Sequence, residues 1–293
     1  MIDVKKVIKE DASLTEASLD RYLSEERVGG GTLREAMRYS TLGGGKRIRA
    51  ALAIEFAKLF GGTADVALPF ASANEMIHAY SLIHDDMPCM DDDDMRRGKP
   101  SSHIKFGEAA ALLPGDTLLT FAFEVAAGAA ASPLGVIEAV KTFAYYAGAL
   151  GMTGGQVMDE ENVSDTYEKL MKLHSLKTSA LIKAASLSGY FATVIDKIDH
   201  AVVSDITEYS ECLGLAFQIK DDLLDLEGDA ATLGKRVGVD EKNGRYNSLS
   251  FMTPDEARDE CERLAARASA IISKYPGSEF LAELPHYLNS RNK

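Results

Sequence analysis

Six aspartates and two arginines are concentrated between Asp85 and Arg97, in the stretch DDMPCMDDDDMRR. Carboxylates this close together need a counter-charge to stay ionised, and their oxygens are the ligands that hard divalent cations prefer. Mg²⁺ is commonly held by one or two carboxylates together with substrate phosphates, and the planar guanidinium groups of Arg96 and Arg97 suit phosphate. The stretch predicts a reaction centre for a phosphorylated substrate; the alternative is a solvated acidic loop with a basic end.

A second aspartate set makes the reaction centre the better interpretation. Asp221 and Asp225 are four residues apart on one predicted helical face. Each set ends a polar seam whose members are spaced 4, 3 and 4 residues apart, as expected for helices that build a polar site inside a bundle. The two seams are Asn74, His78, Ser81 and Asp85, and Gly214, Gln218, Asp221 and Asp225.

Pro88 limits the helix that carries the first seam. We expect a helix from Ala71 to His84 that does not continue past Asp86, because proline lacks an N–H and restricts the preceding residue. Asp91 is then predicted to return from a short loop towards the helix end.

The segment Gly43–Arg49, GGGKRIR, joins a predicted helix end to a helix start. Glycines there allow backbone amides to approach an anion, and the helix N-terminus adds partial positive charge. The spacing is not that of a Walker loop, and a C-cap followed by a turn is the alternative interpretation.

Two further positions are unusual for helix interiors. Gly154 and Gly155 each cost about 1 kcal/mol relative to alanine inside a helix, so we expect a close backbone approach, either a helix crossing or a ligand contact. Lys177 interrupts an apolar stripe, which is unfavourable unless the lysine meets an anion.

Composition limits the class of protein. The 293 residues carry a net charge of −13, which argues against nucleic acid or an anionic membrane as partner. No stretch is typical of a signal peptide or a membrane-spanning helix, and stable membrane insertion is not expected. A reduced, cytoplasmic setting is favoured because one of the three cysteines has no possible intramolecular partner and none has metal-ligand spacing. The cysteines are Cys89, Cys212 and Cys261.

Apolar residues recur at helical spacing through most of the chain, and strand-type alternation is rare. The sequence therefore predicts an all-α fold, a single-domain bundle of about ten helices around a central cavity spanning residues 1–293. Besides 71–84, the predicted helical ranges are 33–42, 48–60, 109–131, 135–148, 167–191, 205–226 and 253–274.

Several motifs occur together in a fixed order. They are GGGKRIR (43–49), DDMPCMD (85–91), RRG (96–98), GDTLL (115–119), GMTGGQVMD (151–159), LHSLKTSALI (173–182), DDLLD (221–225) and LGKRVGVD (233–240). With these motifs, covering roughly residues 30 to 293, the chain resembles the trans-isoprenyl diphosphate synthases, and most resembles their bacterial short-chain type, the farnesyl diphosphate synthases.

The resemblance implies roles for individual residues. Isopentenyl diphosphate would be held by Lys46, Arg49, His78 and Arg97. The allylic diphosphate would be held by Arg96, Lys177, Thr178, Gln218 and Lys235. Mg²⁺, three ions with substrate bound, would be held by Asp85, Asp86, Asp91, Asp221 and Asp225.

The expected reaction begins when the allylic C–O bond ionises, after which the isopentenyl double bond attacks the allylic carbon. The catalytic residues would be Asp85, Asp91, Asp221, Lys177 and Lys235. No side-chain base is expected, because the departing diphosphate of the family is thought to accept the final proton. Water must be excluded from the cation, and the segments 228–245 and 290–293 are candidate lids.

The resemblance places Tyr80, with Ser81 beside it, as the block that stops chain growth at the C15 product. At 100° per residue, Ser81 lies about 40° and Tyr80 about 140° from Asp85 around the helix, so periodicity does not support the Tyr80 assignment. Arg245 and Tyr246 depart from the family pattern of a lysine followed by Thr-Tyr, which could alter lid closure.

Other functions are weighed against this one. A geranylgeranyl or geranyl diphosphate synthase remains an alternative within the family. A class I terpene cyclase would not need the second diphosphate site, and a non-catalytic partner subunit would be expected to have lost an aspartate motif. A homodimer is expected from family likeness and from the frequency of twofold oligomers.

Overall fold

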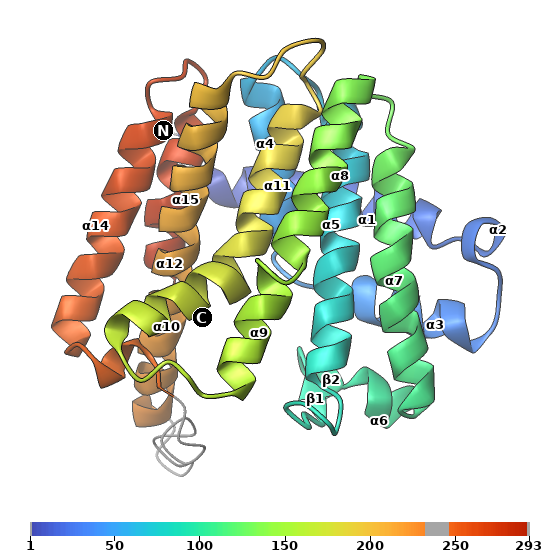
Figure 1. Ribbon diagram of the computed structural model, residues 1–293, viewed down its shortest axis with the longest axis horizontal. Helices are drawn as coiled ribbons and strands as arrows, with labels where there is room; N and C mark the ends of the chain where they lie inside the picture. The colour runs from blue at the N-terminus through green and yellow to red at the C-terminus, as the bar shows by residue number, and fades with distance from the viewer. Residues whose placement is uncertain (1, 232–245, 292–293) are drawn as a thin grey trace. The chain divides into compact units, whose positions relative to one another are not determined.

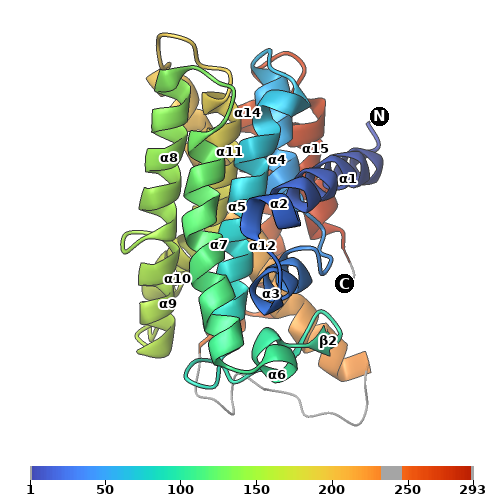
Figure 2. The same ribbon diagram turned by 90° about the vertical axis from the view of Figure 1, so that its right-hand side faces the viewer.

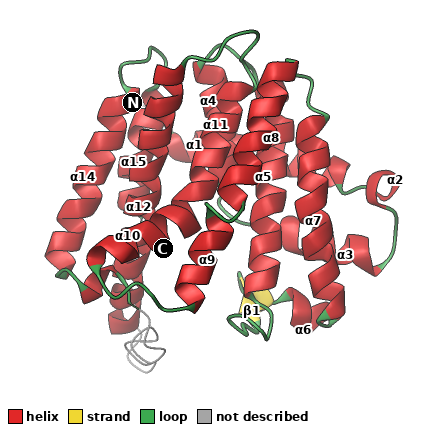
Figure 3. Cartoon of the chain, in the orientation of Figure 1, coloured by secondary structure: helices red, strands yellow, loops and turns green. Residues whose placement is uncertain are grey.

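The computed structural model describes residues 2–231 and 246–291 (Figure 1). Lys235, Arg245 and most of the candidate lid 228–245 therefore lie outside the described residues. Among the described residues, helices make up almost all of the regular structure, and strands appear only as one short pair (Figure 3). The predicted all-α fold is confirmed.

The chain divides into two compact units. The N-terminal unit comprises Lys5–Phe143 with Ala185–Lys197, and the C-terminal unit comprises Ala144–Ala184 and Ile198–Lys293 together with Met1–Val4. Two of the boundaries lie inside helices α8 (Pro133–Ala147) and α11 (Ala180–Phe191). The organisation as one domain stays a prediction.

The N-terminal unit holds the first aspartate motif and the glycine loop. Its remaining elements are α1 (Val4–Tyr22), α2 (Glu25–Val28), α3 (Thr32–Thr41), α4 (Ile48–Leu59), α5 (Ala64–Asp85), β1 (Met95–Arg96), β2 (Lys99–Pro100), α6 (Ser102–Phe106) and α7 (Ala109–Ala127). Apolar periodicity located α3, α4 and α7 to within a few residues, but it placed the start of α5 at Ala71 instead of Ala64 and did not predict α1, α2 or α6.

Small side chains let α4 and α5 pack closely. A buried cluster of Ala50, Ala53, Ile54, Ala57, Ala67, Leu68 and Ala71 joins the two helices. α5 also packs along α7, and the two run side by side in both views (Figures 1 and 2). α7 is the one helix among the described residues that is long and apolar enough to cross a membrane, but its packing on α5 is that of a core helix.

The strand pair β1–β2 forms a hairpin that the sequence did not predict. Met95 pairs with Pro100 and Arg96 with Lys99, antiparallel. The two turn residues Arg97 (φ 52°) and Gly98 (φ 74°) both have positive φ, as two-residue hairpin loops require. Four paired residues are too few for alternation to be visible in the sequence.

The C-terminal unit holds the second aspartate motif and Lys177. Its other elements are α9 (Met152–Glu160), α10 (Tyr167–His174), the π-helix η1 (Ser175–Ser179), α12 (His200–Ala231), the 3₁₀ turn η2 (Ser248–Ser250), α14 (Pro254–Ile272) and α15 (Glu279–Asn289). α12 packs most extensively on α14, and α14 on α15. Thr253 and Glu256 form a capping box that starts α14.

Candidate active site

The first aspartate motif begins where α5 ends. The helix stops at Asp85, and the amide N–H of Asp91 donates to the carbonyl oxygen of Asp85 at 2.9 Å. The predicted return of Asp91 to the helix end is therefore confirmed. Both side chains are partly exposed, and their backbones meet across a tight loop.

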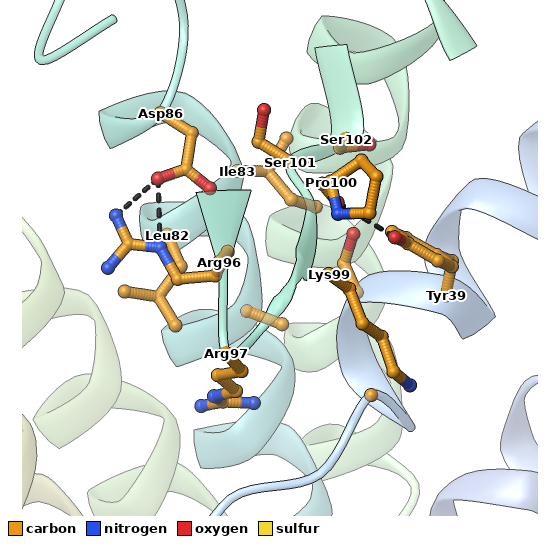
Figure 4. Close-up of a pocket in the computed structure, with 13 residues that line it drawn as sticks. Tyr39, Leu82, Ile83, Asp86, Arg96, Arg97, Lys99, Pro100, Ser101 and Ser102 are labelled. Atoms are coloured by element: carbon orange, nitrogen blue, oxygen red, sulfur yellow. Dashed lines mark hydrogen bonds and ion pairs between the residues drawn. The ribbon is translucent and has the colours of Figure 1, made fainter. Parts of the chain in front are cut away.

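Asp86 behaves differently from its neighbour. Its side chain is buried, and its Oδ1 accepts a hydrogen bond from Arg96 Nε at 2.8 Å and a second from Arg96 Nη2 (Figure 4). Burial raises the pKa of Asp86, and the hydrogen bond from Arg96 offsets part of that rise. The pair fixes the β1–β2 hairpin on the end of α5, whereas the roles of Asp86 in metal binding and Arg96 in diphosphate binding stay predictions.

A small cavity lies beside this hairpin. Its volume is about 40 Å³, and Tyr39, Leu82 and Ile83 line it with the Asp86–Arg96 pair (Figure 4). The hydroxyl of Tyr39 donates to the carbonyl of Pro100 at 2.7 Å and ties the hairpin to α3. A space of this size can hold ordered water but not an isoprenoid diphosphate.

The glycine loop runs from the end of α3 to the start of α4, as predicted. Gly44 (φ 101°) and Gly45 (φ 126°) adopt backbone conformations that disfavour any side chain. Arg97 Nη1 donates to the carbonyl of Gly44, and a Cβ at Gly45 would lie 3.2 Å from the Arg97 guanidinium. The glycines thus make room for an arginine from the hairpin.

Arg49 and His78 meet in the same unit. Arg49 Nη1 lies 3.4 Å from His78 Nε2, which must accept because arginine can only donate. Burial lowers the pKa of His78 well below its usual value, and the nearby Arg49 and Arg97 lower it further. Arg49 Nε is buried and has no hydrogen-bond partner among the described residues. We call Lys46, Arg49, His78 and Arg97 the loop cluster; it has the donors and the charge to hold an anion.

In the C-terminal unit, the second aspartate motif repeats one feature of the first. Asp222 is buried, and its Oδ2 accepts from the amide of Ser248 at 2.8 Å. Asp221 is partly exposed and Asp225 exposed. In both motifs the second aspartate has a structural bond inside its own unit, and the first and last aspartates are more accessible.

Lys177 lies in the π-helix η1, which interrupts the helix predicted for 167–191. Its Nζ lies 2.5 Å from Asp159 Oδ2 on α9. A Cβ at Gly155 would lie 2.4 Å from the amide nitrogen of Lys177, so Gly155 lets α9 cross directly against η1. Of the two interpretations of the glycine pair, the helix crossing is correct for Gly155. Single π-turns of this kind are frequent at functional sites.

Thr178 and Gln218 are also brought together. The hydroxyl of Thr178 donates to Gln218 Oε1 at 3.0 Å, and Gln218 Nε2 lies 3.4 Å from Asp222 Oδ1. Two of the predicted diphosphate-binding residues of this unit are thus linked to each other and to Asp222 of the second motif.

Tyr80 and Ser81 lie on different faces of α5. The Tyr80 side chain is buried, with its ring edge-on to that of His84 at a centroid distance of 5.7 Å. The hydroxyl of Ser81 donates back to the carbonyl of His78 at 2.9 Å. Burial suits Tyr80 as a packing residue, and its role in setting product length stays a prediction.

The donor chemistry of the two motifs fits Mg²⁺. The accessible candidates are all carboxylates, which are the hard oxygen ligands this ion takes. Among the residues that the structure describes, no three histidine, cysteine or acidic side chains are grouped to hold a metal by themselves. That is expected for Mg²⁺, which usually keeps waters and completes its shell with substrate phosphates.

Sequence reasoning missed the acidic residues that form ion pairs with lysine and arginine side chains in and around the site. Asp159 was visible only as the last residue of a motif without an assigned role, and Glu75 only as a carboxylate one turn before His78. Periodicity cannot reveal such pairing, because each partner comes from a different helix or loop.

The comparisons with known proteins give relatives that match most of the chain. The family model for polyprenyl synthetase matches residues 31–273. The farnesyl diphosphate synthase of Escherichia coli (strain K12) is 40% identical over 268 residues, which cover 88% of this chain and 89% of the relative. The chloroplastic geranylgeranyl pyrophosphate synthase of Catharanthus roseus is 40% identical over 248 residues, covering 83% and 69%. The crystal structure of geranylgeranyl pyrophosphate synthetase from Pyrococcus horikoshii Ot3 gives a TM-score of 0.87 at 28% identity, covering 98% of each chain.

An all-helical fold with two aspartate motifs and separate cation groups defines a class of enzyme that acts on diphosphates. The chain belongs to the polyprenyl synthetase family, which confirms the resemblance found in the motifs. It is a transferase of the trans-prenyl diphosphate synthase type.

Proposed function

We propose that this enzyme is a Mg²⁺-dependent farnesyl diphosphate synthase. It condenses isopentenyl diphosphate first with dimethylallyl diphosphate and then with geranyl diphosphate. The loop cluster carries the proposal: the buried Arg49 Nε, which has no hydrogen-bond partner among the described residues, lies on a side chain that contacts His78, and this arrangement supports an anion site there. His78 and Asp85 are seven residues apart on α5, about 10 Å along the helix axis, so an anion site and a carboxylate site share one rigid element.

Two separate candidate diphosphate-binding sites support a two-substrate transferase over a terpene cyclase. In the N-terminal unit the loop cluster would bind isopentenyl diphosphate. In the C-terminal unit Lys177, Thr178 and Gln218 would bind the allylic diphosphate, with Arg96 and Lys235 assigned to the same substrate. A cyclase needs only one diphosphate-binding site. A non-catalytic subunit would not be expected to keep both aspartate motifs.

The residues of the chain act mainly through electrostatics. Asp85, Asp91 and Asp221, with Asp86 and Asp225 as further candidates, would hold up to three Mg²⁺ ions. When bound, these ions supply the positive charge that stabilises the leaving diphosphate. Lys177 and Arg96 each exchange a carboxylate partner for the diphosphate and stabilise its charge as the allylic C–O bond breaks. Arg49 and His78 orient the isopentenyl substrate so that its double bond attacks the allylic carbon.

The identities of the relatives do not separate a C15 from a C20 product, since a farnesyl and a geranylgeranyl synthase are equally similar. The proposal of a C15 product rests on the bulky ring of Tyr80, five residues before Asp85. A geranylgeranyl diphosphate synthase is the second candidate, favoured by the likeness to the Catharanthus roseus relative, with a geranyl diphosphate synthase as the third.

The test is to incubate the full chain with Mg²⁺, labelled isopentenyl diphosphate and, separately, dimethylallyl, geranyl or farnesyl diphosphate, and to resolve the products by chain length. A C15 product from the first two allylic substrates, little elongation of the third, and loss of activity with EDTA would support the proposal. A C20 product would retain the chemistry and reject the farnesyl assignment. Absence of EDTA-sensitive elongation would reject the function.

We also propose a cytoplasmic homodimer, as expected from the family. Light scattering coupled to size-exclusion chromatography measures the oligomeric state directly, and a monomeric mass at micromolar concentration would contradict the proposal.

A further inference from the structure

Arg47 occupies an unusual place in the glycine loop. It follows the exposed Lys46 and lies two residues before Arg49, yet its own side chain is buried. Its backbone adopts a left-handed conformation, φ 52° and ψ 33°, at the N-cap of α4. A side chain is disfavoured there, and the usual solution is glycine, so interactions of the Arg47 side chain must hold the turn.

The guanidinium of Arg47 is engaged with groups from three elements of the N-terminal unit. Nη1 donates to Glu75 Oε2 on α5 at 2.8 Å, and Nη2 donates to the carbonyl of Thr41 at the end of α3 at 2.5 Å. Glu16 Oε1 on α1 lies 3.6 Å from Nε. Both terminal nitrogens donate to protein oxygens, which favours a structural role for Arg47, although its buried Nε, like that of Arg49, has no hydrogen-bond partner among the described residues.

Glu75 is the acidic member of this group. It lies one helical turn before His78 on α5, and its side chain is 4% exposed, compared with 3% for Arg47. Its charge also favours the cationic forms of Arg49 and Arg97, whose pKa values are otherwise lowered by burial. The carboxylate of Glu75 therefore supplies a negative charge next to the loop cluster.

A buried ion pair of this kind needs a reason beyond stability. Replacing such a pair with apolar residues of similar volume is often neutral or stabilising, because both charges must be removed from water. In this loop the pair joins the turn between α3 and α4 to the helix that carries His78. The pair thus fixes the backbone segment that carries Lys46 and Arg49.

We propose that Arg47 and Glu75 are a positioning pair for the isopentenyl diphosphate site. Glu75 holds Arg47, Arg47 holds the left-handed turn, and the turn directs Lys46 and Arg49 at the substrate diphosphate. Neither member touches the substrate. The inference rests on the proposed role of the loop cluster in binding isopentenyl diphosphate.

Glu75→Gln is the first test, because it keeps the size and removes the charge. We expect KM for isopentenyl diphosphate to rise about tenfold, whereas kcat changes less than threefold and KM for the allylic substrate stays as in the wild type. The affinity for inorganic diphosphate, titrated by calorimetry without allylic substrate, should fall by a similar factor. Equal changes in both KM values would overturn the proposal.

The double variant Arg47→Met/Glu75→Met separates positioning from folding. It removes both buried charges, so its melting temperature should return towards that of the wild type relative to either single variant. The KM for isopentenyl diphosphate should remain raised, because the pair is still absent. Recovery of KM together with stability would show that the pair matters only for folding.

Glu124→Gln is the matched control. It removes the carboxylate of an exposed ion pair with Arg27 in the same unit, at 3.0 Å, and should leave both KM values unchanged. The outcomes also separate the two proposals. If the wild type elongates the substrate and Glu75→Gln has an unchanged KM for isopentenyl diphosphate, only the positioning pair is contradicted. If the wild type does not elongate the substrate and Arg49→Met binds diphosphate as tightly as the wild type, the proposed function itself is contradicted.

Discussion

Arg291 lies directly on Asp221 of the second aspartate motif. Its Nη2 donates to Asp221 Oδ1 at 2.5 Å and to the carbonyl of Phe217 at 3.0 Å, and its guanidinium stacks 3.9 Å above the Phe217 ring. The residue belongs to the segment 290–293 that was predicted as a candidate lid. A cation from the C-terminal segment is therefore paired with a carboxylate that is expected to bind metal.

Metal binding at Asp221 should consequently compete with Arg291. We predict that Arg291→Met raises the affinity for Mg²⁺, measured by calorimetry without diphosphate, about fivefold, the equivalent of one ion pair of about 1 kcal/mol. Arg258→Met, which removes an exposed pair with Asp255, is the control. Unchanged or weaker Mg²⁺ binding by the Arg291 variant would show that the pair does not oppose the metal.

Tyr80 provides a prediction on product length. Tyr80→Ala removes a buried ring and should shift the main product from C15 to C20 in the chain-length assay. Tyr80→Phe keeps the ring and should retain the C15 product, so that volume is separated from the hydroxyl. The exposed Tyr145 gives a neutral alanine control. A C15 product from a folded Tyr80→Ala enzyme would remove Tyr80 as the block.

The close crossing at Gly155 predicts a steric effect. Gly155→Ala would place a Cβ 2.4 Å from the backbone nitrogen of Lys177, which cannot yield as a flexible side chain would. We expect a loss of about 1–3 kcal/mol in the free energy of unfolding, measured with urea. The nearest atom to a Cβ at Gly128 is 3.4 Å away, so Gly128→Ala should be close to wild type. Equal stability of the two variants would contradict the crossing.

His174 predicts a dependence of stability on pH. The side chain is buried, and burial lowers its pKa from 6.5 to about 4, with a further contribution from Lys177. The unfolded chain therefore binds more protons than the folded chain between these values, and stability falls as the pH drops from 6.5 towards 4. The loss should reach about 3 kcal/mol.

Unfolding of His174→Leu across this pH range checks the assignment. His174 Nδ1 has no hydrogen-bond partner among the described residues, so an apolar replacement should be tolerated. The variant should lose stability less steeply than the wild type, and a substitution of the exposed His200 should leave the slope unchanged. A slope that survives in His174→Leu would assign the acid sensitivity to other groups.

The helical fold and much of the candidate site could be predicted from local sequence features. The end of α5 at Asp85 follows from Pro88, and the return of Asp91 follows from that end. The glycine loop between α3 and α4 was predicted from residue type alone. Such features depend on how proline and glycine restrict or free the backbone within a few residues, and these residues can be read directly from the sequence.

Tertiary structure decided which of the polar residues are buried in structural contacts and which stay accessible. Asp86 and Asp222 are identical in type to their neighbours, but each is buried by a partner from another element, Arg96 and the Ser248 amide. The pairs Lys177–Asp159 and Arg47–Glu75 likewise join segments that are distant in sequence. The sequence by itself determined most of the long helices, the family resemblance and the set of candidate groups. Only the packing of helices against one another determined their partners, because burial and ion pairing depend on distances in space that helical periodicity does not contain.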